Sequence, residues 1–219
     1  MRIEKLHYSL NSDSPTYGLR KKLQLRKTTT SNQSIIINET SALFETLHIG
    51  THIDFPLHFV VHGKTYSDYS SDHWFVESCA LYDTKKEGRI LKIVHDTITN
   101  ISAEILFINT KDSKNRYAKS FAQENSGLNL IDVLDICERM PSLRFIALDN
   151  ISISRCGDSK EGSQIHQFLL ERDILIIEDL NIEPLLNLGL PDKVIISPLP
   201  LEGVDGVPIS IYAIYENIK

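Results

Sequence analysis

Short runs of isoleucine, leucine and valine recur along the chain, each bounded by polar residues, glycine or proline. Short runs rich in β-branched residues are typical of strands. We therefore predict strands over residues 34–37, 89–94, 105–108, 145–148, 174–177, 194–197 and 209–214.

Apolar residues at helical spacing are fewer. They predict a helix over residues 129–140, stopped by Pro141, a second over 163–172 and a short turn over 181–188. Because strands outnumber helices, and helices separate several of the later strands, a mixed α/β fold with a partly antiparallel sheet is expected. The polar stretch 109–129 predicts a lid or a surface excursion. No repeat or linker divides the 219 residues, which predicts one domain over 1–219.

The composition and charge of the chain argue against nucleic acid and membrane as partners. The chain is 42% hydrophobic and 24% charged, with a formal net charge of −6 and one short basic cluster, Arg20–Lys27. This balance argues against nucleic-acid binding, which requires clustered basic residues. No apolar run approaches the ~18 residues of a membrane span. The three cysteines are widely spaced, and the N-terminus lacks a signal-peptide pattern, so a cytoplasmic protein is expected.

Histidine is concentrated in one window of the sequence. Residues 48–58 contain His48, His52 and His58, with Asp54 among them. Chance would place about 0.4 of the histidines there. Neutral imidazole and carboxylate are common ligands of zinc and similar divalent ions. The window is therefore a candidate metal site.

The spacing of these ligands limits the backbone of the window. In a straight strand, His48 and His52 would lie about 13 Å apart, whereas donor atoms around one ion lie within about 4 Å of each other. A helix would bring His48 and His52 together but turn Asp54 to another face. Gly50 provides the freedom for a curled loop, so a strand end that folds around an ion is predicted. A turn with surface histidines is the alternative.

Other candidate residues lie outside the window. His166 falls in the predicted helix 163–172, and Glu178 ends the apolar run 174–177; alone, they would be an ordinary surface histidine and a strand-end charge. Tyr17, Phe44 and Phe59 are candidates for an aromatic pocket, with core packing as the alternative.

The motif H-x-G-T-H-x-D-x-P-x-H at residues 48–58 resembles the signature of the metal-dependent cyclase family, which includes kynurenine formamidases and isatin hydrolases. Segments 125–128, 149–152, 176–180 and 197–208 also resemble family segments, so the resemblance covers nearly the whole chain. It implies a single compact α/β domain with a mixed, barrel-like central sheet and flanking helices, of the swivelling β/β/α type. It also implies a homodimer that binds a small-molecule substrate.

The resemblance assigns roles to individual residues. It implies two divalent ions per chain, with zinc as the first choice and manganese as the second. The implied metal ligands are His48, His52, Asp54, His166 and Glu178. Of these, His48, His52 and Asp54 would bind one ion and His166 would bind the other, with Asp54 and Glu178 bridging the two. His58 resembles the catalytic acid/base, and Tyr17 and Phe59 would bind substrate.

The implied activity is hydrolysis of a C–N bond in an aryl formamide or cyclic amide by metal-activated water, with N-formylkynurenine as the first substrate to test. A cyclase, dehydratase or lactone hydrolase of the same family is the alternative, and a non-catalytic metal-binding module is a third interpretation. The chain departs from the family around Tyr17 and at Lys111, both predicted to touch the substrate pocket. Thr51 would either form a hydrogen bond with a ligand or the substrate, or stabilise the turn. Asp149 would either orient a ligand imidazole or cap a strand end.

Overall fold

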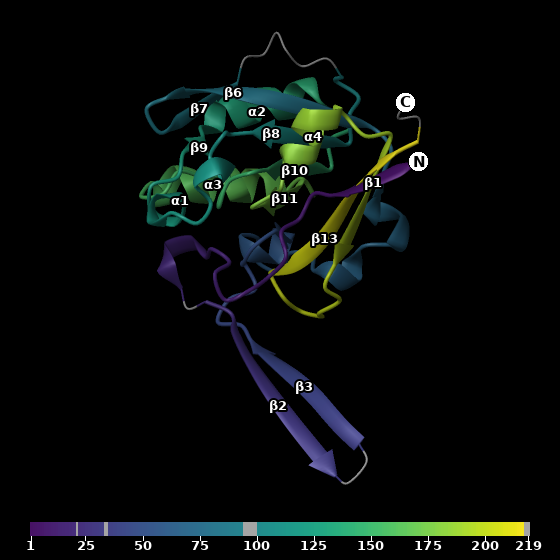
Figure 1. Ribbon diagram of the computed structural model, residues 1–219. Helices are drawn as coiled ribbons and strands as arrows, with labels where there is room; N and C mark the ends of the chain where they lie inside the picture. The colour runs from purple at the N-terminus through teal and green to yellow at the C-terminus, as the bar shows by residue number, and fades with distance from the viewer. Residues whose placement is uncertain (21, 33–34, 94–99, 217–219) are drawn as a thin grey trace.

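Two sheets of very different size organise the chain in the computed structural model, which describes residues 1–20, 22–32, 35–93 and 100–216 (Figure 1). The larger sheet has eleven strands and the smaller has two, β2 and β3. The strands are β1 (Arg2–Lys5), β2 (Gln24–Asn32), β3 (Ile35–Leu43), β4 (His52–Asp54), β5 (Phe75–Val76), β6 (Cys79–Glu87), β7 (Ile90–Ile93), β8 (Ile105–Asn109), β9 (Gly127–Leu128), β10 (Phe145–Leu148), β11 (Leu175–Glu178), β12 (Lys193–Pro198) and β13 (Gly206–Tyr215).

The large sheet is mixed, as predicted. Its order is β5-β12-β13-β4-β11-β10-β8-β6-β7-β9, with β1 paired to β13. The pairs β6–β8, β8–β10 and β10–β11 are parallel. Strand β4 is antiparallel to both β11 and β13. Every residue of β8, β10 and β11 is buried, which explains why these strands are apolar up to the polar end residues Asn109 and Glu178. The short strand β4 therefore lies between the parallel strands β11, β10, β8 and β6 on one side and the antiparallel strands β13, β12 and β5 on the other.

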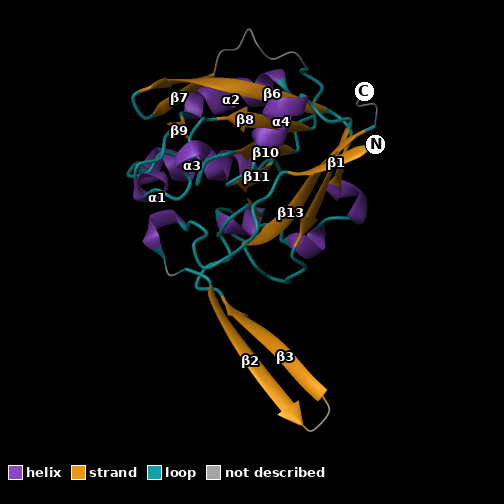
Figure 2. Ribbon diagram, viewed as in Figure 1, coloured by secondary structure: helices purple, strands orange, loops and turns teal. Residues whose placement is uncertain are grey.

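The helices lie beside the large sheet (Figure 2). They are α1 (Lys119–Gln123), α2 (Leu130–Arg139), α3 (Ser159–Leu170) and α4 (Glu183–Leu188). Helix α3 packs on β11 and against α2. No helix among the described residues is long and apolar enough to cross a membrane.

Most of the predicted elements are present. All seven predicted strands and the helix 129–140 are confirmed, although residues 34 and 94 of two predicted strands lie outside the described residues. Helix α3 begins four residues earlier than predicted, because Asp158 caps its first turn by accepting a hydrogen bond from the Glu161 N–H. That first turn carries no apolar residue, so periodicity could not reveal it. The polar stretch 109–129 contains α1 and the strand β9.

The β2–β3 hairpin projects away from the rest of the molecule (Figure 1). Its strands pair with each other from Gln24↔Leu43 to Asn32↔Ile35 and belong to no other sheet. Strand β2 is almost wholly polar and both faces of the hairpin are exposed, so the sequence shows none of the alternation that marks a half-buried strand.

Candidate metal centre

Two histidines and two carboxylates meet where β4, β11 and α3 come together. In the antiparallel pair β4–β11, His52 lies opposite Glu178, and Asp54 follows two residues later on the same face of β4. His166 approaches from α3, which packs on β11. These four residues are buried, each 5% exposed or less. Such a concentration of ionisable groups requires compensation by opposite charge.

The spacing of these four residues fits an ion better than direct hydrogen bonds. His52 Nε2 lies 3.6 Å from Asp54 Oδ1 and 3.5 Å from Glu178 Oε2. His166 Nε2 lies 3.8 Å from Asp54 Oδ2 and 3.6 Å from Glu178 Oε1. Ligand atoms bound tetrahedrally at zinc distances are separated by roughly 3.3–3.5 Å. The gaps therefore suit a divalent ion among His52, Asp54 and Glu178, whose ligand atoms all lie within 4.8 Å of one another, while His166 faces the other oxygen of each carboxylate.

Hydrogen bonds on the far side of each ring orient these histidines. His52 donates from Nδ1 to the Gly50 carbonyl at 2.8 Å, and His166 donates from Nδ1 to the Gly162 carbonyl at 2.7 Å. Because Nδ1 donates to a carbonyl, each Nε2 points at the carboxylates and is the nitrogen that an ion would bind. Glu178 is held by the Ile153 N–H, which donates to Oε1 at 2.7 Å. The donor set is thus oriented before any ion binds.

A second group of donors shares Asp54. His48 Nδ1 lies 2.8 Å from Asp54 Oδ1, and its Nε2 lies 3.0 Å from Asp205 Oδ2. His58 Nδ1 lies 2.8 Å from the same oxygen of Asp205, and the His48 and His58 rings stack with centroids 4.2 Å apart. One ligand atom from each of His48, Asp54 and His58 falls within 4.8 Å of the others. Asp54 therefore connects two potential ion positions.

The carboxylates in this cluster favour protonation of its histidines, and the histidines favour ionisation of Asp54. Burial alone would lower the pKa of His48, but the carboxylates of Asp54 and Asp205 raise it to about 10. Burial likewise opposes charge on His52 and His166, yet attraction to Glu178 and Asp54 raises the pKa of both. Burial would raise the pKa of Asp54, whereas the surrounding imidazoles lower it. Without an ion, protons on the histidines compensate the carboxylates.

Metal binding should therefore release protons. His48 is protonated below a pH of about 10, and an ion that takes its lone pair must expel that proton. Metal affinity should consequently rise with pH between 7 and 9, by up to about tenfold per pH unit for each proton released. Calorimetry of zinc binding in two buffers with different ionisation enthalpies measures the number of protons. Zinc binding with no proton release and no pH dependence would contradict this assignment.

Two glycines make the curl of the histidine window possible. Gly50 has a φ of 60°, and a Cβ there would lie 2.4 Å from Leu10 Cδ2. Gly206 opens β13 opposite Asp54, and a Cβ at that position would lie 2.6 Å from Cε1 of His48. The chain thus turns before β4, and the His48 ring packs directly on the bare backbone of β13. The window is a curled segment ending in a short strand.

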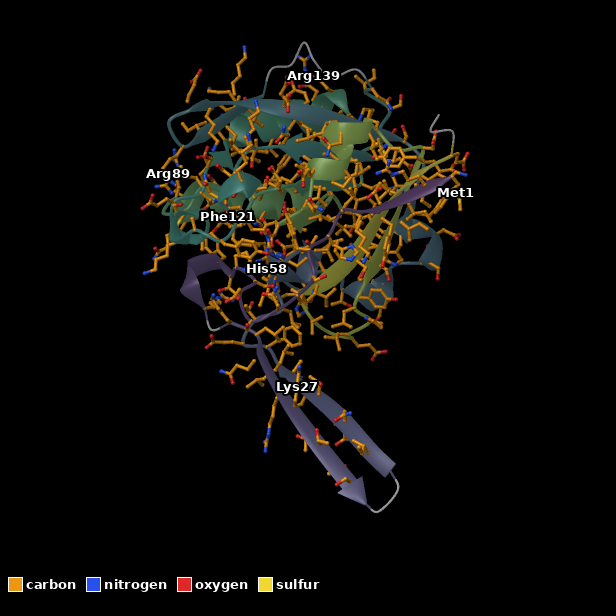
Figure 3. The ribbon with its side chains drawn as sticks, in the orientation of Figure 1. Met1, Lys27, His58, Arg89, Phe121 and Arg139 are labelled. Carbon is orange, nitrogen blue, oxygen red and sulfur yellow. The ribbon has the colours of Figure 1, made fainter. Side chains whose placement is uncertain are left out.

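The donor cluster opens into a cavity of about 260 Å³. Tyr17 and Phe59 line this cavity, whereas Phe44 lines a separate groove beside Pro198. The remaining lining side chains are largely polar: Arg20, Thr46, Ser152, Ser154, Asp158, Ser159 and Ser163. Figure 3 places His58 at the centre of the molecule, on the side from which the hairpin projects.

The structure gathers every predicted ligand together with His58, but it changes the picture of several neighbours. Asp149 accepts a hydrogen bond from the Thr110 N–H at 2.6 Å, and glycine carbonyls orient the rings of His52 and His166 instead. Of the two roles considered for Asp149, this contact supports the strand-end one. Thr51 Oγ1 donates to the Asp179 carbonyl at 2.7 Å, so it links backbone segments.

Lys111 does not line the cavity, contrary to prediction; its Nζ donates to the Thr84 carbonyl at 3.3 Å. Asp205, for which no role was predicted, contacts both His48 and His58. The only signal for it was its place in the C-terminal segment that resembles the family. Local spacing gave no indication, because 147 residues separate it from His58.

Comparison with known proteins shows the family to which the chain is similar. The Cyclase family model, described as "Putative cyclase", matches residues 5–155. No curated protein sequence matches the chain. Isatin hydrolase A from Labrenzia aggregata, bound to benzyl benzoate, superposes with a TM-score of 0.78 at 16% identity, covering 98% of this chain and 94% of that one.

Two further solved structures are similar. One, described as a potential metal-dependent hydrolase with cyclase activity, has a TM-score of 0.69 at 20% identity and covers 99% of both chains. The other, a predicted metal-dependent hydrolase from Bacillus stearothermophilus, has a TM-score of 0.67 at 22% identity and covers 97% of both chains. These likenesses confirm the predicted α/β fold class. Because the family model spans more than half of the sequence, including the whole histidine window, the chain belongs to the cyclase family.

Proposed function

We propose that this protein is a metal-dependent amidohydrolase that cleaves the C–N bond of an aryl formamide or a cyclic amide. The observation that carries the proposal is the convergence of two Nε2 lone pairs and two carboxylates at ion spacing, in a cavity that also contains His58. Similar structures described as isatin hydrolase or metal-dependent hydrolase support hydrolysis as the reaction class. N-formylkynurenine is the first substrate to test.

We assign two divalent ions per chain, zinc first and manganese second. His48, His52 and Asp54 would hold one ion and His166 the other, with Asp54 and Glu178 shared by both, as the family resemblance implies. Two observations support this division. His48 and His52 both face Asp54 Oδ1, whereas His166 faces Asp54 Oδ2. His52 and His166 likewise face different oxygens of Glu178. When bound, such ions lower the pKa of water and polarise a carbonyl oxygen.

The side chains around the ions supply positioning and proton transfer. His58 Nδ1 faces Asp205, which leaves its Nε2 to take the proton from the attacking water and return it to the leaving nitrogen. The water oxygen first bonds to the carbonyl carbon to give a tetrahedral adduct. The C–N bond then breaks as the adduct collapses and the nitrogen takes the proton from His58. Tyr17 and Phe59 would contact an aromatic substrate, since both line the cavity. The Phe59 ring also stacks on His166 at 4.7 Å, which fixes one wall beside the donor cluster.

A substrate panel tests the proposal directly. We expect the zinc-loaded or manganese-loaded protein to hydrolyse N-formylkynurenine or a simpler aryl formamide, and to lose the activity on chelation. Isatin and simple lactones complete the panel. Activity confined to a lactone or to isatin would reject the formamidase assignment. Failure to bind any divalent ion would reject metal-dependent hydrolysis altogether.

We also propose that residues 1–219 form one domain of a cytoplasmic homodimer. The three free cysteines agree with a reducing compartment. For the dimer, support comes from the β2–β3 hairpin, because a two-stranded hairpin is marginally stable alone in water. The register places Leu25 with Ile36 on one face and Ile37 with Leu43 on the other, all 48–71% exposed. A second copy of the chain would cover these apolar groups.

Lysine in place of both Leu25 and Ile36 should therefore convert the dimer to a monomer, because it charges one contact face. Sedimentation equilibrium measures the mass. The matched control replaces Ile131 and Leu186, which are exposed on α2 and α4, by lysine. A wild-type monomer, or a hairpin variant that stays dimeric, would contradict the proposed interface.

A further inference from the structure

One carboxylate oxygen contacts both histidines of the second donor group. Asp205 Oδ2 lies 2.8 Å from Nδ1 of His58 and 3.0 Å from Nε2 of His48. The two rings are inclined by only 30° and stacked, which lets both N–H groups reach the same oxygen. We propose that Asp205 is a positioning residue, which orients His58 for proton transfer and His48 for metal binding. This inference rests on the proposed function for its catalytic consequence.

The backbone sets the position of Asp205 relative to the histidine window. Strand β13 begins at Gly206, opposite Asp54 on β4, and the Phe55 N–H donates to the Asp205 carbonyl at 2.9 Å. A short 3-10 helix, Pro56–His58, follows at once, and the His58 N–H donates to the Phe55 carbonyl at 2.9 Å. The backbone of Phe55 is therefore hydrogen-bonded to both Asp205 and His58, although these two residues lie 147 positions apart.

The neighbouring glycine completes the seat for the rings. A Cβ on Gly206 would lie 2.6 Å from Cε1 and 3.0 Å from Nε2 of His48. The absence of a side chain at Gly206 therefore lets the His48 ring come close enough to donate to Asp205. Asp205 therefore accepts the hydrogen bond from the His48 ring, and Gly206 leaves the space that the ring occupies.

This contact determines which nitrogen of His58 is available. A carboxylate can only accept, so the Nδ1 of His58 carries a proton and the Nε2 of the neutral ring is free to act as a base. When the other nitrogen of His48 binds an ion, its remaining N–H still donates to Asp205. The Asp205 side chain is 44% exposed, so solvent screens its charge and its main contribution is orientation.

The test measures ring tautomers and turnover in the same variants. Nuclear magnetic resonance of 15N-histidine-labelled, zinc-loaded protein should show His58 with its proton on Nδ1, and Asp205→Ala should lose that preference. In Asp205→Ala, we expect kcat to fall about 10–100-fold while KM changes less than about twofold. Asp205→Asn, whose side-chain oxygen can still accept from Nδ1, should fall between the wild type and Asp205→Ala.

Glu202→Gln is the matched control, because it removes one carboxylate from the same loop at an exposed position. An unchanged His58 tautomer in Asp205→Ala would overturn the inference, as would an unchanged kcat. Loss of a zinc ion with the tautomer preserved would also overturn it, because Asp205 would then be a metal ligand. If the wild type hydrolysed nothing in the panel, the proposed function would fail, while the resonance measurement would still test Asp205.

Discussion

Asparagine in place of Asp54 should remove divalent metal and hydrolysis together. Asp54 faces His52 and His166 at ion spacing and is also bonded to His48, so it is shared by both donor groups. The substitution keeps the size of the side chain but removes its negative charge, which the surrounding imidazoles and the ions require. Since loss of an outer-shell partner costs about 10–100-fold in metal affinity, loss of this shared ligand should cost roughly 100-fold or more.

Mass spectrometry of the metal content and calorimetry of zinc binding measure this effect, and circular dichroism checks that the variant folds. Asp72→Asn is the matched control, because Asp72 is exposed and outside both donor groups. A folded Asp54→Asn protein that still held both ions would remove Asp54 from the metal centre. Retention of one ion would show that the two positions are independent.

Glutamine in place of His58 should abolish turnover while leaving the metal bound. The side-chain amide can replace the hydrogen bond to Asp205, but it cannot take up and release a proton near neutral pH. Loss of a general acid/base costs about 10²–10⁴-fold in rate. Steady-state kinetics with the panel substrate, together with metal content of the same sample, measures both quantities.

His62→Asn controls for loss of a nearby histidine. His62 is exposed four residues beyond His58 and has a φ of 58°, a conformation that asparagine tolerates. Full activity in His58→Gln would exclude His58 as the proton carrier. Loss of an ion would assign it as a ligand, which its place in the group with His48 and Asp54 also allows.

The sequence predicted those parts of the fold that have a local cause. Strands β8, β10 and β11 are buried on both faces, so apolar residues fill them except for Asn109 and Glu178 at two of their ends. Helix α2 has one buried face and an Asn129 cap, so its period was visible. The β2–β3 hairpin was only half predicted, because both of its faces are exposed and nothing enforces alternation in β2.

Within the candidate site, the sequence by itself determined the local group of candidate ligands and the curl at Gly50, because ligand spacing along a short segment limits its backbone. Only the tertiary structure brings the distant candidate ligands to this segment. The antiparallel register of β4 on β11 brings Glu178 opposite His52, and the packing of α3 brings His166 to the same point. The start of β13 places Asp205 beside His58. These contacts depend on strand register and helix packing between distant segments, which no local spacing encodes.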